Sequence, residues 1–243
     1  MISERQLAER FDSFWQQHFP LLNASFVRRF NAEQQERVTT VEGAAVLPVP
    51  MGEGIQRFDL VAELAFEQAL AELVAQAGVA PDFRAASQKA LSKIALLKRE
   101  PFIPPPDELE ISETNRLLNV YRSFFARLSI GEIQFKPRIR GTGILDAMEA
   151  DFCTAETLFE VKTVHRNLLS SDLRQVVCYL VAGLGSRHFS WSEYCIFNPR
   201  LGVFYHGRID ELLAYTSGRT PHECINGFLD SLMDREQPIE SRF

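Results

Sequence analysis

The sequence predicts an α/β protein in which a core of strands and helices is preceded by a helical N-terminal domain. Three observations predict this class. Residues 1–100 consist mostly of segments with helical spacing of apolar residues. The proline-rich stretch 101–106 then interrupts any helix, because proline lacks the amide donor and fixes φ. Beyond it, a helical pattern, three short strand patterns and a second helical pattern follow in order. We therefore expect a helical domain over residues 1–105 and an α/β domain over residues 106–243.

The N-terminal half is expected to contain four helices. Ser3 can cap a helix that runs to about Phe19, and Pro20 ends it. Residues 24–37 form a second segment with apolar residues on one side, and residues 44–55, with two prolines and two glycines, are expected to be a loop. Residues 58–77 and 83–99 are built from strong helix formers. The cations of the last helix either form a basic face or are ordinary solvated side chains; they are Lys89, Lys93, Lys98 and Arg99.

In the C-terminal half, Ser112 can cap a helix that extends to Leu128. Residues 133–140, 143–148 and 158–164 have strand composition and should form an antiparallel meander, with Pro137 favouring an edge or a bulge. A helix over 172–184, two strands at 194–197 and 202–206, and closing helices at 209–215 and 222–233 complete the expected order.

Composition limits the function classes. The chain has 243 residues, 46% of them hydrophobic, which suffices for a sizeable core. No apolar run is long enough to span a bilayer, and the charged N-terminus does not resemble a signal peptide, so we expect a cytoplasmic protein with no membrane partner. Its four cysteines show no zinc-type spacing and are expected to be reduced. A net charge of -6 argues against a protein that holds nucleic acid by charge alone.

Ionisable residues recur within segments that should be buried, and such charges require a reason. Side chains alternate along a strand, so Glu160 and Lys162 share one face of the strand 158–164. If 143–148 is its hairpin partner, Asp146 approaches the same end; Asp151 is the alternative, and Glu149 a weaker third choice. Two carboxylates beside an ammonium could hold Mg²⁺ and orient a water, which is the chemistry of phosphodiester hydrolysis.

This arrangement resembles the PD-(D/E)XK nuclease superfamily, in which an aspartate on one strand is followed by an acid-x-lysine on the next. The matching residues are Asp146, Glu160 and Lys162, and Gln175 with Tyr179 matches the Gln-x-x-x-Tyr of the exonuclease-like branch. The family's proline before the aspartate is replaced by Leu145. The resemblance covers the C-terminal half and implies a restriction-endonuclease-like core: helix, three-stranded meander, helix, further strands.

The resemblance also implies cofactor and activity. It implies a deoxyribonuclease dependent on Mg²⁺, with Mn²⁺ as a possible substitute, in a restriction or phage-defence complex. The implied metal ligands are Asp146, Glu160 and the carbonyl of Val161, and Glu113 is a candidate whose alternative role is that of a first-turn helix acid. A catalytically inactive binding or scaffold subunit and an RNA-directed nuclease stay open as alternatives.

Four basic residues lie near the expected site in sequence. Lys136, Arg138 and Arg140 share one strand face, and Arg166 follows the Glu-x-Lys strand. They are candidates for phosphate contacts, or else edge charges that prevent aggregation. Because so few cations are available, we expect weak binding to DNA and action within a homo-oligomer or beside a motor or recognition subunit. The N-terminal aromatics, among them Phe11, Trp15, Phe26 and Phe58, either dock such a partner or fill the protein's own core.

Overall fold

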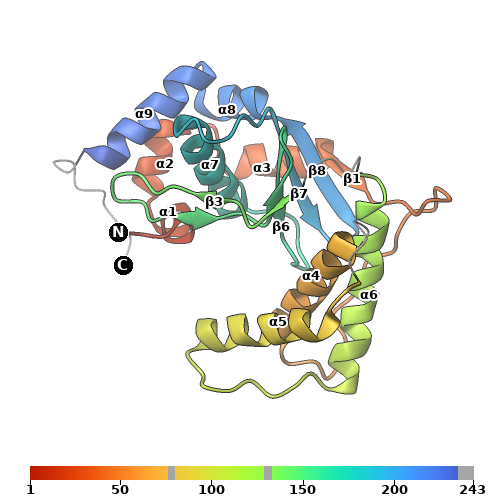
Figure 1. The fold of residues 1–243 in the computed structure, drawn as a ribbon. Helices are drawn as coiled ribbons and strands as arrows, with labels where there is room; N and C mark the ends of the chain where they lie inside the picture. The colour runs from red at the N-terminus through yellow and green to blue at the C-terminus, as the bar shows by residue number, and fades with distance from the viewer. Residues whose placement is uncertain (76–79, 129–132, 235–243) are drawn as a thin grey trace.

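A mixed six-stranded sheet lies at the centre of the protein (Figure 1). The structure is a computed structural model, and it describes residues 1–75, 80–128 and 133–234. The strand order is β1-β8-β7-β6-β5-β2, and within this sheet only β6 and β7 run parallel. The strands of this sheet are β1 (Gln35–Arg37), β2 (Gln134–Phe135), β5 (Phe152–Cys153), β6 (Thr157–Val161), β7 (Glu193–Asn198) and β8 (Val203–Arg208).

A small hairpin continues two of these strands. β3 (Arg138–Ile139) pairs with β4 (Met148–Glu149), and together they extend the β2–β5 pair. The break between β2 and β3 falls at Lys136, which has a positive φ of 48°, and Pro137, which cannot donate to a ladder. Two hydrogen bonds bridge the break and keep the two segments paired. They run from the Lys136 amide to the Asp151 carbonyl and from the Ala150 amide to the Pro137 carbonyl.

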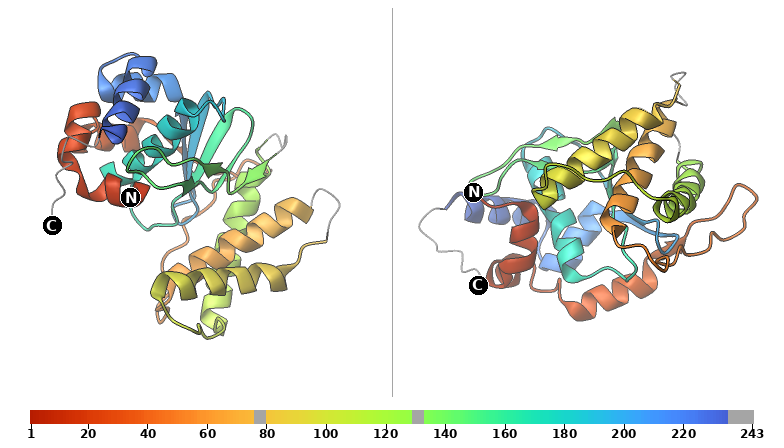
Figure 2. Two further views of the ribbon diagram at one scale, coloured as in Figure 1. Left: turned by 60° about the vertical axis from the view of Figure 1, so that its left-hand side comes forward. Right: turned by 90° about the horizontal axis from the view of Figure 1, so that it is seen from below.

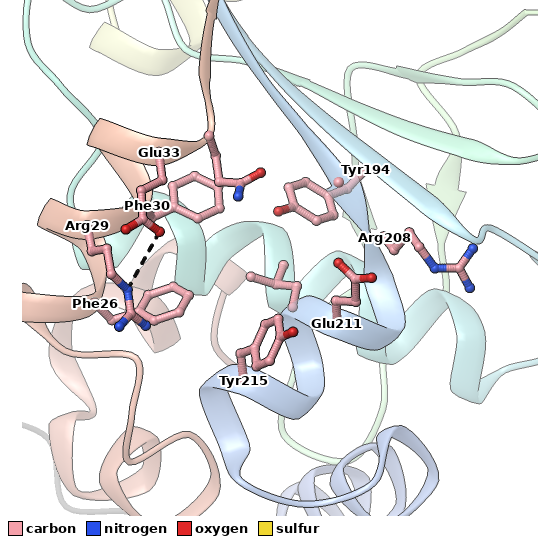
Figure 3. Close-up of a pocket in the computed structure, with 11 residues that line it drawn as sticks. Phe26, Arg29, Phe30, Glu33, Tyr194, Arg208, Glu211 and Tyr215 are labelled. Atoms are coloured by element: carbon pink, nitrogen blue, oxygen red, sulfur yellow. Dashed lines mark ion pairs between the residues drawn. The ribbon is translucent and has the colours of Figure 1, made fainter.

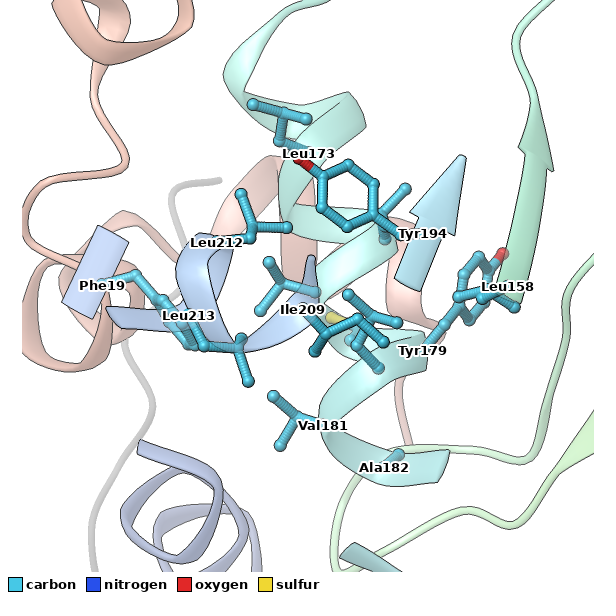
Figure 4. Close-up of a cluster of buried hydrophobic side chains, with 14 of the residues drawn as sticks. Phe19, Leu158, Leu173, Tyr179, Val181, Ala182, Tyr194, Ile209, Leu212 and Leu213 are labelled. Carbon is cyan, nitrogen blue, oxygen red and sulfur yellow. The ribbon is translucent and has the colours of Figure 1, made fainter. Parts of the chain in front are cut away.

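Helices cover both faces of the sheet (Figure 2). Across the described residues they are α1 (Glu4–Arg10), α2 (Asp12–His18), α3 (Ala24–Glu33), α4 (Phe58–Ala75), α5 (Phe83–Lys98), α6 (Glu108–Phe125), α7 (Ser170–Gly185), α8 (Ile209–Ser217) and α9 (Pro221–Met233). Alternation along β6 sends Leu158 into a core shared with α7, and Phe159 into a second core shared with α4 and α6. Figure 4 shows part of the first core, including Leu158, Leu173 and Tyr194.

An arm of helices projects from one end of the sheet. α6 begins on the arm and ends against the sheet, where Phe124 stacks on Phe197 with ring centroids 4.0 Å apart (Figure 1). α4 packs between α5 and α6. Its contact with α5 is formed by the buried apolar side chains of Leu60, Leu64, Ala90 and Ile94. The arm is therefore anchored to the sheet through α4 and α6, whereas α5 lies on the outside.

The mixed α/β class is confirmed, but the chain does not pack as a division at residue 105 predicts. The first three helices join the core of the sheet, with Leu7 and Trp15 fully buried in it, and β1 forms the sheet's edge against β8. α4 and α5 form the projecting arm. α4 packs on α6, which was assigned to the other domain, and α5 packs on α4. The helical unit is therefore an insertion between β1 and the remaining strands.

Several boundaries also differ. The helix expected over 3–19 is two helices separated at Phe11, whose φ of -113° and ψ of 58° are not helical. The segment expected as one helix over 24–37 changes to strand at Gln35. α6 begins earlier than expected because Asp107 and Glu110 form a capping box. No helix within the described ranges is long and apolar enough to cross a membrane.

Candidate functional site

The predicted Glu-x-Lys pair meets as expected. Glu160, in β6, is 5% exposed, and Lys162 follows directly after the strand. The Lys162 Nζ lies 2.8 Å from Glu160 Oε1, and both side chains are largely buried. The shared strand face predicted from alternation is therefore confirmed.

The second carboxylate belongs to Asp151, and the prediction that Asp146 lies on the hairpin partner of β6 is wrong. That partner is β5, with Phe152 opposite Phe159, so Asp151 precedes the paired residues on the neighbouring strand. Its Oδ2 accepts a 2.6 Å hydrogen bond from the Val161 amide. Asp151 is therefore hydrogen-bonded to the residue of β6 that lies between Glu160 and Lys162. The carbonyl of Val161 remains a predicted metal ligand.

Asp146 lies instead in a turn that packs against the N-terminus. Its amide donates to the Ile2 carbonyl at 2.9 Å, and Leu145 forms bridges with Ile2 and with Thr142. Gly143 in this turn has a φ of 59°, which a strand does not allow. Residues 143–147 therefore form a turn, and the chain enters β4 at Met148.

The charges in this cluster act on one another. Burial raises the pKa of Asp151 well above its ordinary value, and the charge of Glu160 raises it further, against the Val161 amide and Lys162. Burial by itself lowers the pKa of Lys162, but the attraction of Glu160, Asp172 and Asp151 outweighs this, and the pKa is raised overall. The lysine is thus a charged ammonium, whereas Asp151 and Glu160 repel each other in a way that a bound cation would relieve.

Gln175 and Tyr179 of α7 join the cluster as predicted. The Lys162 ammonium donates to Gln175 Oε1. Gln175 Nε2 donates to the Tyr179 hydroxyl at 2.8 Å, since the two residues are one helical turn apart. Burial, more than the nearby carboxylates, raises the pKa of Tyr179, so its phenol stays protonated.

Glu4 of α1 is a member of the cluster that the sequence did not indicate. Its Oε1 accepts from Gln175 Nε2 at 3.3 Å and from the Tyr179 hydroxyl at 3.5 Å. In the sequence Glu4 is only an acid in the first turn after the Ser3 cap. Its role depends on the packing of α1 on α7, which no local pattern reports.

A small cavity opens beside the ammonium. It has a volume of about 200 Å³ and lies between α1, α7 and the segment after β6. Its lining includes Lys162 and Gln175 together with Arg5, Glu9, Arg166 and Ser171. Lys162 and Gln175 are therefore accessible from this side.

A larger cavity, of about 430 Å³, lies between α3, β8 and α8 and has Phe30, Tyr194 and Tyr215 among its walls (Figure 3). None of the predicted site residues lines it.

The four predicted phosphate contacts have different surroundings. Lys136 is 19% exposed and pairs with Glu67 at 2.5 Å, and Arg166 pairs with Asp172 at 2.5 Å. Arg138 and Arg140 are exposed on and directly after β3. Two of the four are thus held by protein carboxylates, and the other two face solvent.

Glu113, the predicted additional metal ligand, has a structural role. Its Oε1 pairs with Arg200, and both side chains are 3% exposed. Its Oε2 accepts a 2.7 Å hydrogen bond from the Gly52 amide. Because both carboxylate oxygens are used to fix the 44–55 loop and the end of β7 on α6, the assignment of Glu113 to the metal site is wrong.

The donor set suits a magnesium ion. Asp151, directly before β5, and Glu160 in β6 supply hard carboxylate oxygens. Mg²⁺ in proteins is commonly held by one or two carboxylates while it keeps several waters. No group of three or more His, Cys, Asp or Glu side chains in the described residues forms a metal cluster. Two protein carboxylates, with waters or a substrate phosphate, would be enough to hold Mg²⁺ without a third carboxylate.

Comparisons with protein-family models, with curated proteins and with solved structures found no match to this chain.

Proposed function

We propose that this protein is a metal-dependent nuclease that hydrolyses phosphodiester bonds, with DNA as its substrate. The observation that supports it best is the convergence of Asp151, directly before β5, with Glu160 in β6 and Lys162 directly after it. A core acid-lysine pair needs no second carboxylate, yet here a second one lies beside it at a raised pKa. That arrangement is costly for stability unless a cation or a substrate uses it.

The order of elements also supports the proposal. α6 precedes three antiparallel stretches, which are β2 with β3, β4 with β5, and β6; α7 then leads into β7, parallel to β6. This is the order expected of a restriction-endonuclease-like core. Gln175 on α7 contacts the lysine, as the Gln-x-x-x-Tyr resemblance implies.

In the proposed mechanism, Asp151 and Glu160 would hold Mg²⁺, or Mn²⁺ in its place. The metal, when bound, supplies a Lewis acid that stabilises charge on the scissile phosphate. Lys162, kept charged by its carboxylate neighbours, orients the attacking water or stabilises the developing negative charge. Gln175, fixed by Tyr179 and Glu4, orients the ammonium through its carbonyl oxygen.

The test is a cleavage assay with Mg²⁺ or Mn²⁺ on linear, circular and single-stranded DNA and on RNA. We expect DNA to be cut, and Lys162→Ala to lower the rate by at least about 100-fold. Asp151→Asn serves as a second inactive variant, since removing a charge beside Glu160 should not impair folding. Lys98→Ala, which also removes an ion-paired lysine, is the matched control.

Three outcomes contradict the proposal. Cleavage that persists in folded Lys162→Ala and Asp151→Asn would remove the assigned site. No cleavage of any substrate, with binding retained, would favour the inactive scaffold subunit. Cleavage of RNA alone would move the activity to the RNA-directed alternative.

A further inference from the structure

A ladder of ion pairs joins α4 to α5. Asp59, Glu63 and Glu67 recur every four residues along α4, and each pairs with a lysine of α5. The N–O distances are 3.0 Å for Lys98 with Asp59, 2.8 Å for Lys93 with Glu63, and 3.0 Å for Lys89 with Glu67. These pairs explain why a basic helix packs on α4.

Glu67 pairs with two lysines, Lys89 and Lys136. The carboxylate is 3% exposed and also receives Lys136 of the sheet at 2.5 Å. Burial pushes the pKa of Glu67 up, but the hydrogen bonds from Lys136 and Lys89 outweigh it and the pKa is lowered overall. Lys136 is 19% exposed and Lys89 is 56% exposed. If an external anion approaches, Lys89 can turn to it while Lys136 still neutralises Glu67.

The ladder passes close to the candidate site. Burial raises the pKa of Asp151, and the ammonium of Lys93 is among the charges that act against this rise. Lys89 is likewise within the field of Glu149 on β4. The contacts of Lys136 place the Lys89–Glu67 pair beside Asp151, because the Lys136 amide donates to the Asp151 carbonyl at 3.0 Å and the Lys136 ammonium shares Glu67 with Lys89. Lys93, one turn further along α5, is 42% exposed.

We propose that Lys89 and Lys93 of α5 form a phosphate-binding site for the backbone of a nucleic acid, which they hold beside Asp151. The inference rests on the proposed nuclease function and adds contacts on the helical arm to it. Arg138, which lies opposite Glu149 in the β3–β4 pair, and Arg140 are both exposed and are further candidates for phosphate contacts. The arm then acts as the second wall of the substrate site, which explains why it is inserted between β1 and the remaining strands.

The test measures binding separately from cleavage. A short labelled DNA, as a duplex and as a single strand, is titrated by fluorescence anisotropy in EDTA over a series of NaCl concentrations. The double variant Lys89→Gln/Lys93→Gln removes both charges, but each amide can still donate to Glu67 or Glu63. Lys98→Gln, which changes the lysine of α5 that pairs with Asp59, is the matched control.

We expect the double variant to bind more weakly and its slope of log affinity against log salt to be shallower. For duplex DNA we expect the magnitude of this slope to fall by about 1.8, because each of the two lost phosphate contacts contributes about 0.9. Lys98→Gln should keep the wild-type slope, and thermal melting should show that all the variants are folded.

The outcomes separate the two proposals. If wild type cuts DNA and the double variant keeps its affinity and slope, the phosphate site is refuted and the nuclease proposal stands. If binding depends on Lys89 and Lys93 but nothing is cut, the phosphate site stands and the nuclease proposal fails. If the wild-type protein neither binds nor cuts, both fail.

Discussion

At the scale of single residues, the site depends on which aspartate approaches β6. Asp151 accepts from the Val161 amide and lies in the field of Glu160 and Lys162, whereas Asp146 lies in a turn bound to Ile2. The difference of five positions in sequence decides the ligand set. It also gives a direct test of the metal site.

We predict that Asp151→Asn weakens Mg²⁺ binding by at least about tenfold, or 1.4 kcal/mol. Asp146→Asn should leave the affinity within twofold of wild type, about 0.4 kcal/mol, because its carboxylate is not part of the cluster. Calorimetric titration of both variants with Mg²⁺ and Mn²⁺ measures this. Equal losses, or a larger loss for Asp146→Asn, would place the metal elsewhere.

Glu113 provides the second test at this scale. Glu113→Ala leaves the buried Arg200 guanidinium without its carboxylate and removes the acceptor of the Gly52 amide. We expect the free energy of unfolding to fall by about 3–5 kcal/mol, as measured by urea denaturation. Glu108→Ala, at an exposed position of the same helix, should cost less than about 0.5 kcal/mol. A small effect of Glu113→Ala, together with lost metal affinity, would restore it as a ligand.

At the scale of elements, the packing of α2 on α9 contains a buried histidine. His18 is 3% exposed, and its ring lies 4.7 Å from that of Phe14 and 5.8 Å from that of Phe228. Within the described part of the chain, neither ring nitrogen has a hydrogen-bond partner. Burial, with a smaller effect of Arg219, lowers the pKa of His18 to about 4. The folded protein therefore holds this imidazole neutral.

This predicts a loss of stability in acid. The ordinary histidine pKa is about 6.5, so between about pH 6.5 and 4 the unfolded chain binds a proton that the folded chain does not. Stability is then complete above pH 6.5 and falls as the pH drops, by roughly 3 kcal/mol at pH 4. His18→Leu should flatten the profile of unfolding free energy against pH, and His188→Leu, at an exposed position, should not. A pH profile unaffected by His18→Leu would show that the imidazole is not held neutral.

At the scale of the whole molecule, the aromatics that suggested a docking surface are part of the protein's own core. Phe11 and Trp15 are 8% and 0% exposed, and Phe26 and Phe58 are partly buried against the two main cores. The exposed large apolar residues include Leu96, Leu97, Phe102 and Leu109 around the end of α5 and the start of α6. The proposal of a partner subunit therefore rests on net charge and no longer on these aromatics.

Net charge gives the prediction for the whole chain. At -6, with Lys136 and Arg166 largely neutralised by carboxylates, the proposed phosphate contacts are few and comprise Lys89, Lys93, Arg138 and Arg140. We predict weak binding of DNA by the isolated protein, with Kd between about 10⁻⁶ and 10⁻⁴ M at physiological salt. Such affinity implies action as a homo-oligomer or with a motor or recognition subunit. Light scattering combined with a binding titration measures it, and a monomer that binds and cuts DNA tightly without help would contradict it.

The sequence alone determined the features that depend on near neighbours in the chain. Apolar periodicity placed α4, α5, α7, α8 and α9 to within a few residues, because helix formation depends on contacts three and four residues apart. Alternation placed Glu160 with Lys162, and the four-residue spacing placed Gln175 beside Tyr179.

Only the tertiary structure decided which distant segments meet. The pairing of β5 with β6 brings Asp151, and not Asp146, to the site. The packing of α1 on α7 adds Glu4, and the buried guanidinium of Arg200 pairs with Glu113. Residues 35–37 form the edge strand β1 because they pair with β8. These choices are made by burial and pairing between segments up to 175 residues apart, and no local pattern in the chain records them.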